Sequence, residues 1–313
     1  MVTAKTKIGI ALGAGGARGL AHIGVVKSLL EHRIPIDYIA GTSSGAVIGA
    51  MYAATLDIDW VYNRISRFIH SSAYKSIGLD KLKITHQPNA SIFQSAANYM
   101  KEKIIINVAN DRLGLIKQER LHDVIRFMVP VDRFEELKLP FSCASLDLNS
   151  GRDIIFDSGD LVDALSASAA IPGFIPPIEK DGMLLTDGGV SCPIPVRTLQ
   201  RMGADFRIAV NVGQKSFKKL NFPNLLQILG RAEQISTTRL SELKLNDVDI
   251  ALEPDTLNVF WSEFDRLDEL FKSGEIETQK NINRIKQSLF KRKGIRAQLK
   301  KIFGNINLSK ELN

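Results

Sequence analysis

A glycine-rich turn between a buried strand and a helix constrains this chain more than any other feature. Residues 13–19 have the sequence GAGGARG. The apolar run 7–12 before the turn predicts a strand, and residues 19–30 after it place apolar side chains at helical spacing. The first N–H groups of a helix have no partner within the helix and favour an anion. The segment therefore predicts a loop whose backbone could hold an oxyanion.

A second strand–turn–helix unit follows and contains a candidate nucleophile. Residues 36–40 predict a strand, and the apolar sequence after Gly45 predicts a helix. Between them, GTSSG matches the pattern G-x-S-x-G, which holds a serine on a sharp strand-to-helix turn. Gly41 and Gly45 suit such a turn because a Cβ atom has no room beside the serine. Ser43 is therefore the predicted nucleophile in an α/β fold.

Two phosphate-binding interpretations of the glycine turn do not fit. A dinucleotide fingerprint, G-x-G-x-x-G, starting at Gly13 needs a third glycine where Arg18 stands, and a fingerprint starting one residue later lacks its first glycine because Ala14 is there. The acid expected after the second strand is replaced by Ser43 and Ser44. A P-loop fails as well, because no Gly-Lys-Ser/Thr sequence closes the turn.

The base for Ser43 cannot be a late histidine. The last of the five histidines is His122, so the order serine, acid, histidine of α/β-hydrolases is not available. Asp187 follows the strand-like run 182–186 and precedes Gly188 and Gly189. In most proteins such a sequence is only a turn. Here it supplies the candidate base, because partial desolvation raises the pKa of a carboxylate towards working pH.

Four sequence blocks in this order resemble the patatin-like phospholipase family, in its small bacterial type related to the catalytic domain of neuropathy target esterase. The blocks are residues 15–24 (GGARGLAHIG), 41–45 (GTSSG), 166–176 (SASAAIPGFIP) and 187–189 (DGG). The match in order and spacing extends over residues 7–255, with one departure at Ala14, where many members have glycine. The resemblance implies a three-layer α/β/α patatin-like fold with a mainly parallel central sheet and a Ser–Asp dyad.

The resemblance also implies a serine lipid acyl hydrolase that cleaves carboxylic ester bonds of phospholipids or lysophospholipids. Ser43 would attack the ester carbonyl, and Asp187 would accept the proton. The oxyanion hole would lie in the glycine turn, at Gly15, Gly16, Ala17 and Arg18. The supporting motif residues are Gly41, Gly45, Gly188, Gly189 and Pro172.

Arg18 in the turn and His22 in the helix that follows it each have more than one interpretation. Arg18 is the basic residue of this loop in the family, or it forms a structural salt bridge. His22 lies in an apolar stretch of the following helix. We interpret it as a packed, hydrogen-bonded helix residue and not as the base.

Other functions remain open from the sequence. A non-catalytic, membrane-associated regulatory protein could keep the same fold, and a thioesterase or protease could use the same dyad. Neither cofactor nor metal is predicted, because the carboxylate activates the serine and because Cys143 and Cys192 are isolated.

The chain divides into a predicted acyl hydrolase domain, residues 1–260, and a basic amphipathic helical extension, residues 261–313. Within the domain, residues 57–120 interrupt the alternation of strands and helices. This helical insertion is interpreted as a cap beside the site or as a peripheral element without a role in substrate access.

Positive charge is concentrated near the C-terminus. Residues 280–313 contain ten Lys and Arg and one acid, so the remainder of the chain is slightly acidic. A basic amphipathic helix fits an anionic membrane surface. The other interpretations are a helix packed on the core with a solvated basic face, and a disordered tail. Nucleic-acid binding is not expected, because no aromatic stacking platform accompanies the charge.

The expected location is cytoplasmic, with peripheral attachment to the inner face of a membrane. No apolar run approaches the ~18 residues of a transmembrane helix. A signal peptide is not expected, since its cleavage would remove the glycine turn. The expected partner is a lipid or a membrane surface.

Overall fold

The computed structural model describes residues 6–72, 74, 114, 116–214, 216–217, 219–220 and 225–303. The strands are β1 (Ile8–Leu12), β2 (Tyr38–Thr42), β3 (Phe141–Asp147), β4 (Arg152–Phe156), β5 (Ile178–Lys180), β6 (Met183–Asp187), β7 (Phe206–Val210) and β8 (Ile250–Leu252). The helices are α1 (Ala21–Glu31), α2 (Ser44–Thr55), α3 (Ile58–Ile69), α6 (Gln118–Met128), α7 (Leu161–Ser168), α8 (Val196–Arg201), α9 (Leu225–Lys244) and α10 (Leu267–Phe303). The short 3-10 helices are η1 (Gly16–Leu20), η3 (Phe134–Glu136), η4 (Gly188–Val190), η5 (Leu245–Asp247) and η6 (Phe264–Arg266).

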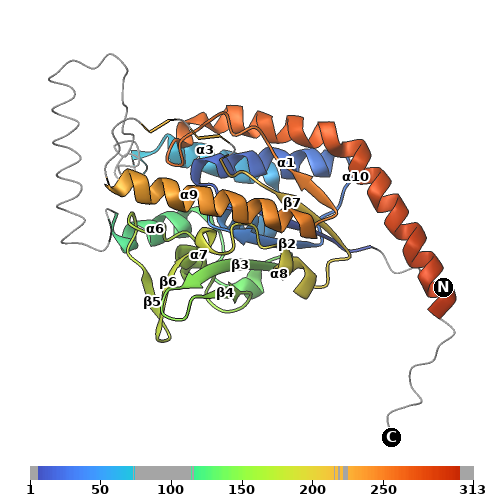
Figure 1. Cartoon of the computed structure of the whole chain (residues 1–313), viewed down its shortest axis with the longest axis horizontal. Coiled ribbons are helices and arrows are strands. Elements are labelled where there is room, and N and C mark those ends of the chain that lie inside the picture. The colour runs from blue at the N-terminus through green and yellow to red at the C-terminus, as the bar shows by residue number, and fades with distance from the viewer. Residues whose placement is uncertain are drawn as a thin grey trace, which may run out of the picture.

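The described strands form one eight-stranded mixed sheet in the order β5-β6-β3-β2-β1-β7-β8, with β4 paired to β3. The central strands β3, β2, β1, β7 and β8 are parallel, whereas β4, β5 and β6 add antiparallel pairs. Helices cover both faces, with α1 and α10 on one side and α8 on the other (Figure 1). The predicted α/β/α architecture with a mainly parallel sheet is confirmed.

The two faces of the sheet differ in side-chain size. The large side chains of β1 belong to the hydrophobic cluster shared with α1, α2 and α10, and they are Ile8, Ile10 and Leu12. Gly9 and Ala11 lie on the other face, where a Cβ atom on Gly9 would come within 2.9 Å of Leu199 on α8. Small residues on this face therefore allow α8 to pack close to the sheet.

Strands β2 and β6 meet end to end on the same side of β3, opposite β4. The last residue of β2, Thr42, pairs in parallel with Ala144. The last residue of β6, Asp187, pairs antiparallel with Ser145, the next residue of β3. Because Ser43 follows Thr42, the two strands bring Ser43 and Asp187 to one point from opposite directions.

Helix α10 packs closely along α1 through a pair of glycines (Figure 1). A Cβ atom on Gly24 of α1 would lie 1.9 Å from the carbonyl oxygen of Phe271, and one on Gly274 of α10 would lie 2.1 Å from that of Ala21. Ile285 of α10 is fully buried. The first part of the segment predicted as an extension thus belongs to a helical layer of the fold.

Several expected elements differ from the structure in extent. The sequence predicts a helix from residue 114 onward, whereas α6 begins at Gln118, and the short antiparallel strand β5 was not predicted. Only α3, α6 and their flanks are described in the helical insertion. The sequence of residues 91–107 also predicts a helix, but this segment lies outside the described residues, so the cap stays a prediction. Among the helices described here, none is at once long and apolar enough to cross a membrane.

The α1–α10 contact gives a stability prediction. Gly24→Ala should lower the free energy of unfolding by about 1–3 kcal/mol, because the new methyl group overpacks against α10. The matched control is Gly230→Ala on α9, where a Cβ atom would meet nothing within 4 Å. It should stabilise the protein by up to about 1 kcal/mol through helix propensity. Urea unfolding measures both, and equal stability of the two variants would contradict the close packing.

Candidate active site

Ser43 occupies a strained turn between β2 and α2. Its φ of 55° and ψ of −126° are unusual for a residue with a side chain. The Ser43 N–H donates to Ser168 Oγ at 3.0 Å, and Ser168 Oγ donates to the carbonyl oxygen of Ala144 at 2.6 Å. Ser168 thereby links the turn to β3. Ser168 belongs to the sequence block 166–176 that resembles the family. Its role as a link depends on a tertiary contact, so the sequence alone does not predict it.

The glycines around Ser43 are required by close backbone approach. A Cβ atom on Gly41 would lie 2.4 Å from Ala46 Cα, and one on Gly45 would lie 2.3 Å from the carbonyl oxygen of Leu12. No side chain fits at either position. The predicted strand–turn–helix context of GTSSG is present, and Ser43 lies where β2 ends.

Ser43 and Asp187 are in direct contact. Ser43 Oγ donates to Asp187 Oδ2 at 2.6 Å, and the N–H of Gly189 donates to Asp187 Oδ1 at 2.7 Å. Only 4% of Ser43 and 5% of Asp187 are exposed. Burial raises the pKa of Asp187 to about 7, against the opposing effect of the two hydrogen bonds, and the charge of Glu233 on α9 adds to the rise. The pair can therefore exchange a proton near neutral pH.

The glycine turn contacts both of the segments that carry this pair. A Cβ atom on Gly19 would lie 2.3 Å from Ser44 Oγ, next to the nucleophile. On the other side, a Cβ atom on Gly189 would lie 3.0 Å from Ala14 Cβ. Ala14, the departure from the family pattern, thus contacts the turn that follows Asp187.

Two of the four N–H groups expected to hold an oxyanion are already bonded. The N–H of Ala17 donates to the carbonyl oxygen of Trp261 at 2.7 Å, and that of Arg18 donates to Gly15 O at 3.2 Å. Within the described residues, the N–H groups of Gly15 and Gly16 have no partner. Gly16 has a φ of +56°, and a Cβ atom there would lie 2.4 Å from Trp261 O.

Arg18 folds back onto its own loop. Its Nε donates to Gly15 O at 3.2 Å, and its Nη1 donates to Gln214 Oε1 at 3.3 Å. Burial lowers the pKa of Arg18 to about 10, so the side chain stays charged. In a trans peptide the C=O and the next N–H point in opposite directions. Holding the Gly15 carbonyl therefore also fixes the direction of the Gly16 N–H.

His22 supports the loop as a neutral group. Its Nε2 lies 2.8 Å from the carbonyl oxygen of Gly13, so Nε2 must be the donor and Nδ1 carries no proton. Burial lowers the pKa of His22 to about 4. The packed helix histidine expected from the sequence is present, and it does not contact Ser43 or Asp187 through any described hydrogen bond.

An aromatic pair borders the glycine turn and was not found by sequence reasoning. The rings of Phe174 and Trp261 meet edge to face, with centroids 4.5 Å apart. Phe174 lies in the turn after Pro172, and Trp261 holds Ala17 through its carbonyl oxygen. No local pattern connects two residues so far apart in the chain.

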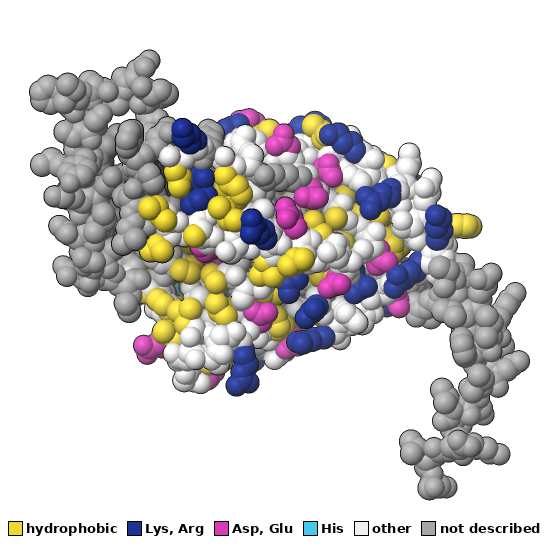
Figure 2. Space-filling model, in the orientation of Figure 1, with side chains coloured by type: hydrophobic (Ala, Val, Ile, Leu, Met, Phe, Trp, Pro, Cys, Tyr) yellow, Lys and Arg dark blue, Asp and Glu magenta, His cyan; other side chains and the backbone are white. Residues whose placement is uncertain are grey.

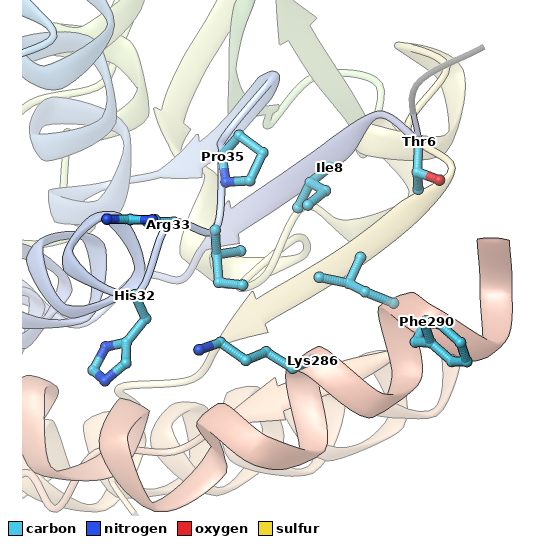
Figure 3. Close-up of a pocket in the computed structure, with 9 residues that line it drawn as sticks. Thr6, Ile8, His32, Arg33, Pro35, Lys286 and Phe290 are labelled. Atoms are coloured by element: carbon cyan, nitrogen blue, oxygen red, sulfur yellow. The ribbon is translucent and has the colours of Figure 1, made fainter. Parts of the chain in front are cut away.

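Other candidate sites lie elsewhere or are not formed. A cavity of about 300 Å³ is lined by Thr6, Ile8 and Lys286 among others (Figure 3). It adjoins the start of β1, whereas Ser43 follows the end of the parallel strand β2. Cys143 and Cys192 are buried free thiols. No cluster of three metal-ligating side chains occurs in the described part of the chain.

Several known proteins are similar to this chain in sequence or in structure. The family model described as patatin-like phospholipase matches residues 10–199. An uncharacterised NTE family protein of Mycobacterium tuberculosis is 36% identical over 206 residues, which are 66% of this chain and 49% of that protein. Lysophospholipase NTE1 of Coccidioides immitis is 34% identical over 206 residues, which are 66% of this chain and 11% of that protein.

The solved structure of VipD from Legionella pneumophila is also similar, with a TM-score of 0.46 and 14% identity. The similarity covers 93% of this chain and 68% of that one. The chain spans about half the length of its mycobacterial relatives and about a tenth of the fungal one. Because the family model covers more than half of the residues, the chain belongs to the patatin-like phospholipase family.

Proposed function

We propose that this protein is a serine acyl hydrolase that cleaves carboxylic ester bonds of phospholipids or lysophospholipids. The observation that carries the proposal is the 2.6 Å hydrogen bond from Ser43 Oγ to a buried carboxylate whose pKa is raised to about 7. The family supports a lipid ester as the substrate, and one relative is named a lysophospholipase.

The proposed reaction uses one carboxylate for every proton transfer. Ser43 Oγ attacks the ester carbonyl carbon while Asp187 takes the hydroxyl proton. The tetrahedral intermediate collapses, and Asp187 returns the proton to the leaving alcohol, which leaves an acyl group on Ser43. Water then attacks the acyl carbonyl while Asp187 accepts a proton from that water. As the bond between the acyl carbon and Ser43 Oγ breaks, Asp187 passes this proton to Ser43 Oγ, which restores the hydroxyl and releases the free fatty acid.

The oxyanion of each tetrahedral intermediate is proposed to bind the glycine turn. Of the four residues predicted for this role, Gly15 and Gly16 have N–H groups without a described partner. Those of Ala17 and Arg18 are engaged within the chain, so these residues shape the loop in place of donating to the oxyanion. Arg18 acts as a positioning residue because it orients the peptide between Gly15 and Gly16.

Labelling with a fluorophosphonate tests the nucleophile. Ser43→Ala should abolish labelling, because the probe bonds only to an activated hydroxyl. Ser44→Ala is the matched control, since Ser44 Oγ is buried without a described hydrogen-bond partner and its loss should leave labelling intact. Intact-mass spectrometry measures both. Labelling that persists in Ser43→Ala would show that another residue is the nucleophile. No labelling of the natural protein would favour a non-catalytic role.

Turnover should depend on the protonation of Asp187. Activity on a soluble ester should rise with pH and reach half its maximum near pH 7, because only the carboxylate accepts the proton. Asp187→Asn should lower kcat by several orders of magnitude at every pH. His22→Gln should cost far less turnover per folded molecule, and an equal loss in the two folded variants would contradict the dyad.

The ionised form of Asp187, which should support turnover, should lower the stability of the folded protein. Since its folded-state pKa lies above 3.8, the folded protein binds the proton more tightly than the unfolded chain. The stabilisation from this group is present at low pH and is lost as pH rises towards 7. Asp187→Asn should therefore raise Tm relative to the natural protein at pH 8, as differential scanning calorimetry can measure.

The proposed role of Arg18 predicts a loss in kcat without a large change in KM. Arg18→Met removes the side-chain hydrogen bond to Gly15 O but keeps similar volume. We expect kcat for a soluble ester to fall about 10- to 100-fold, as for other weakened oxyanion holes. Arg239→Met, at an exposed arginine of α9, is the control. Unchanged kcat in Arg18→Met would show that the loop keeps its geometry without this side chain.

A further inference from the structure

The segment between β8 and η6 has an unusual backbone. Leu257 and Asn258 are consecutive residues with φ of 53°, a conformation that side chains disfavour. The N–H of Leu257 donates to Asp255 Oδ1 at 2.9 Å, and Ser216 Oγ donates to Asn258 Oδ1 at 2.9 Å. Val259 is buried and anchors the turn in the core. The surrounding contacts thus hold the segment in a fixed shape.

This shape presents an aromatic side chain to solvent next to the candidate active site. Phe260 is 42% exposed, and its ring centroid lies 5.9 Å from that of Trp261. Trp261 in turn contacts Phe174, and its carbonyl oxygen holds the N–H of Ala17. A continuous aromatic path therefore leads from the surface to the glycine turn.

More apolar surface lies at the same end of the molecule. Helix α9 contacts η4, which follows Asp187, and its first turns expose Ile228 and Leu229. Figure 2 shows hydrophobic side chains gathered on the left of the described residues, interspersed with Lys and Arg, over the beginning of α9 and the region below it. Apolar side chains that gather at one end of a molecule are typical of an interaction site.

The basic part of α10 lies at the opposite end. Lys286 and Phe290 of α10 line the cavity beside the start of β1 (Figure 3). Phe290 is 78% exposed, but the parallel strands point away from it towards Ser43. A membrane docked on this end would face away from the nucleophile.

We propose that Phe260 inserts into the surface of a phospholipid bilayer and that Trp261 and Phe174 line the path of the acyl chain to Ser43. The proposal rests on the proposed function. Residues 253–263 contain three acids and neither Lys nor Arg, so this segment does not itself attract anionic headgroups. The partner that fits is the hydrocarbon region of a neutral, phosphatidylcholine-type surface, entered by apolar burial.

Phe→Ser substitutions at Phe260 and at Phe290, which lie at opposite ends of the molecule, test the docking surface. Phe260→Ser should weaken binding to phosphatidylcholine vesicles about tenfold or more, the effect of withdrawing one phenylalanine from an apolar environment. Phe290→Ser should leave binding unchanged. Co-sedimentation at low and high salt measures both, and binding should resist salt because it is not electrostatic. Loss only in Phe290→Ser, or loss of binding in high salt, would overturn the proposal in favour of the basic end.

A spectroscopic measurement tests the same surface without altering it. The chain has two tryptophans, Trp60 and Trp261, so Trp60→Phe leaves Trp261 as the only indole. Vesicles of dibromo-phosphatidylcholine should quench its fluorescence strongly, whereas unbrominated vesicles should not. Absence of quenching in protein that sediments with the vesicles would contradict the proposal.

The acyl path is tested by substrate length. For p-nitrophenyl esters of increasing chain length, kcat/KM should rise about fourfold per methylene that is buried against the aromatic pair. Trp261→Leu keeps the backbone carbonyl that holds Ala17 and should reduce the increase in kcat/KM per methylene to about twofold or less. An unchanged increase per methylene in Trp261→Leu would exclude an acyl-chain path along Trp261 and Phe174. If no ester is cleaved by the natural protein, the proposed function fails, while the vesicle measurements still decide which end docks.

Discussion

Antiparallel pairing of β6 with the far end of β3 is the constraint on which the candidate site depends. Parallel strands alone place their carboxyl ends side by side, but here a reversed strand returns to face the end of β2. The chain after Asp187 must stay close to β3, and a Cβ atom on Gly188 would lie 2.3 Å from the carbonyl oxygen of Ala144. Glycine at this position and at Gly45 therefore sets the separation of Ser43 and Asp187.

The burial that raises the pKa of Asp187 also opposes folding. Removal of the carboxylate from water raises its pKa and so brings it closer to the basicity that an alcohol requires. His22 is unsuited to the role of a base, because its Nε2 proton is directed at Gly13 O and its pKa is lowered to about 4. Asp187 is thus the proposed base, and the hydrophobic core on both faces of the sheet must offset its desolvation.

Much of this arrangement was accessible from the sequence because it is encoded locally. The strand, turn and helix around Gly16 and around Ser43 each occupy a short segment, so apolar periodicity and glycine spacing were sufficient to predict them. The strand β5 has three residues, too few for the alternation of apolar and polar side chains that identifies a strand. The contact of Phe174 with Trp261 depends on how distant segments pack, and no window of sequence contains it.

The C-terminal helix illustrates the limit of amphipathic patterns. Apolar residues at helical spacing fit a membrane-bound helix and a packed one equally well. In the structure Ile285 and Leu289 join the main hydrophobic cluster, so this part of the pattern reflects core packing. The side chains further along α10, from residue 293, lie outside the described residues, and anionic docking through them stays a prediction.

The bond between Ala17 and Trp261 has a consequence for the order of biosynthesis. The glycine turn leaves the ribosome before Trp261 is made, and its geometry is completed by that carbonyl group almost 250 residues later in the chain. Helix α10, which packs against α1, is later still. A nascent chain therefore carries Ser43 long before the loop beside it is held in place, and the candidate site is assembled only after the segment around Trp261 has folded back onto the glycine turn.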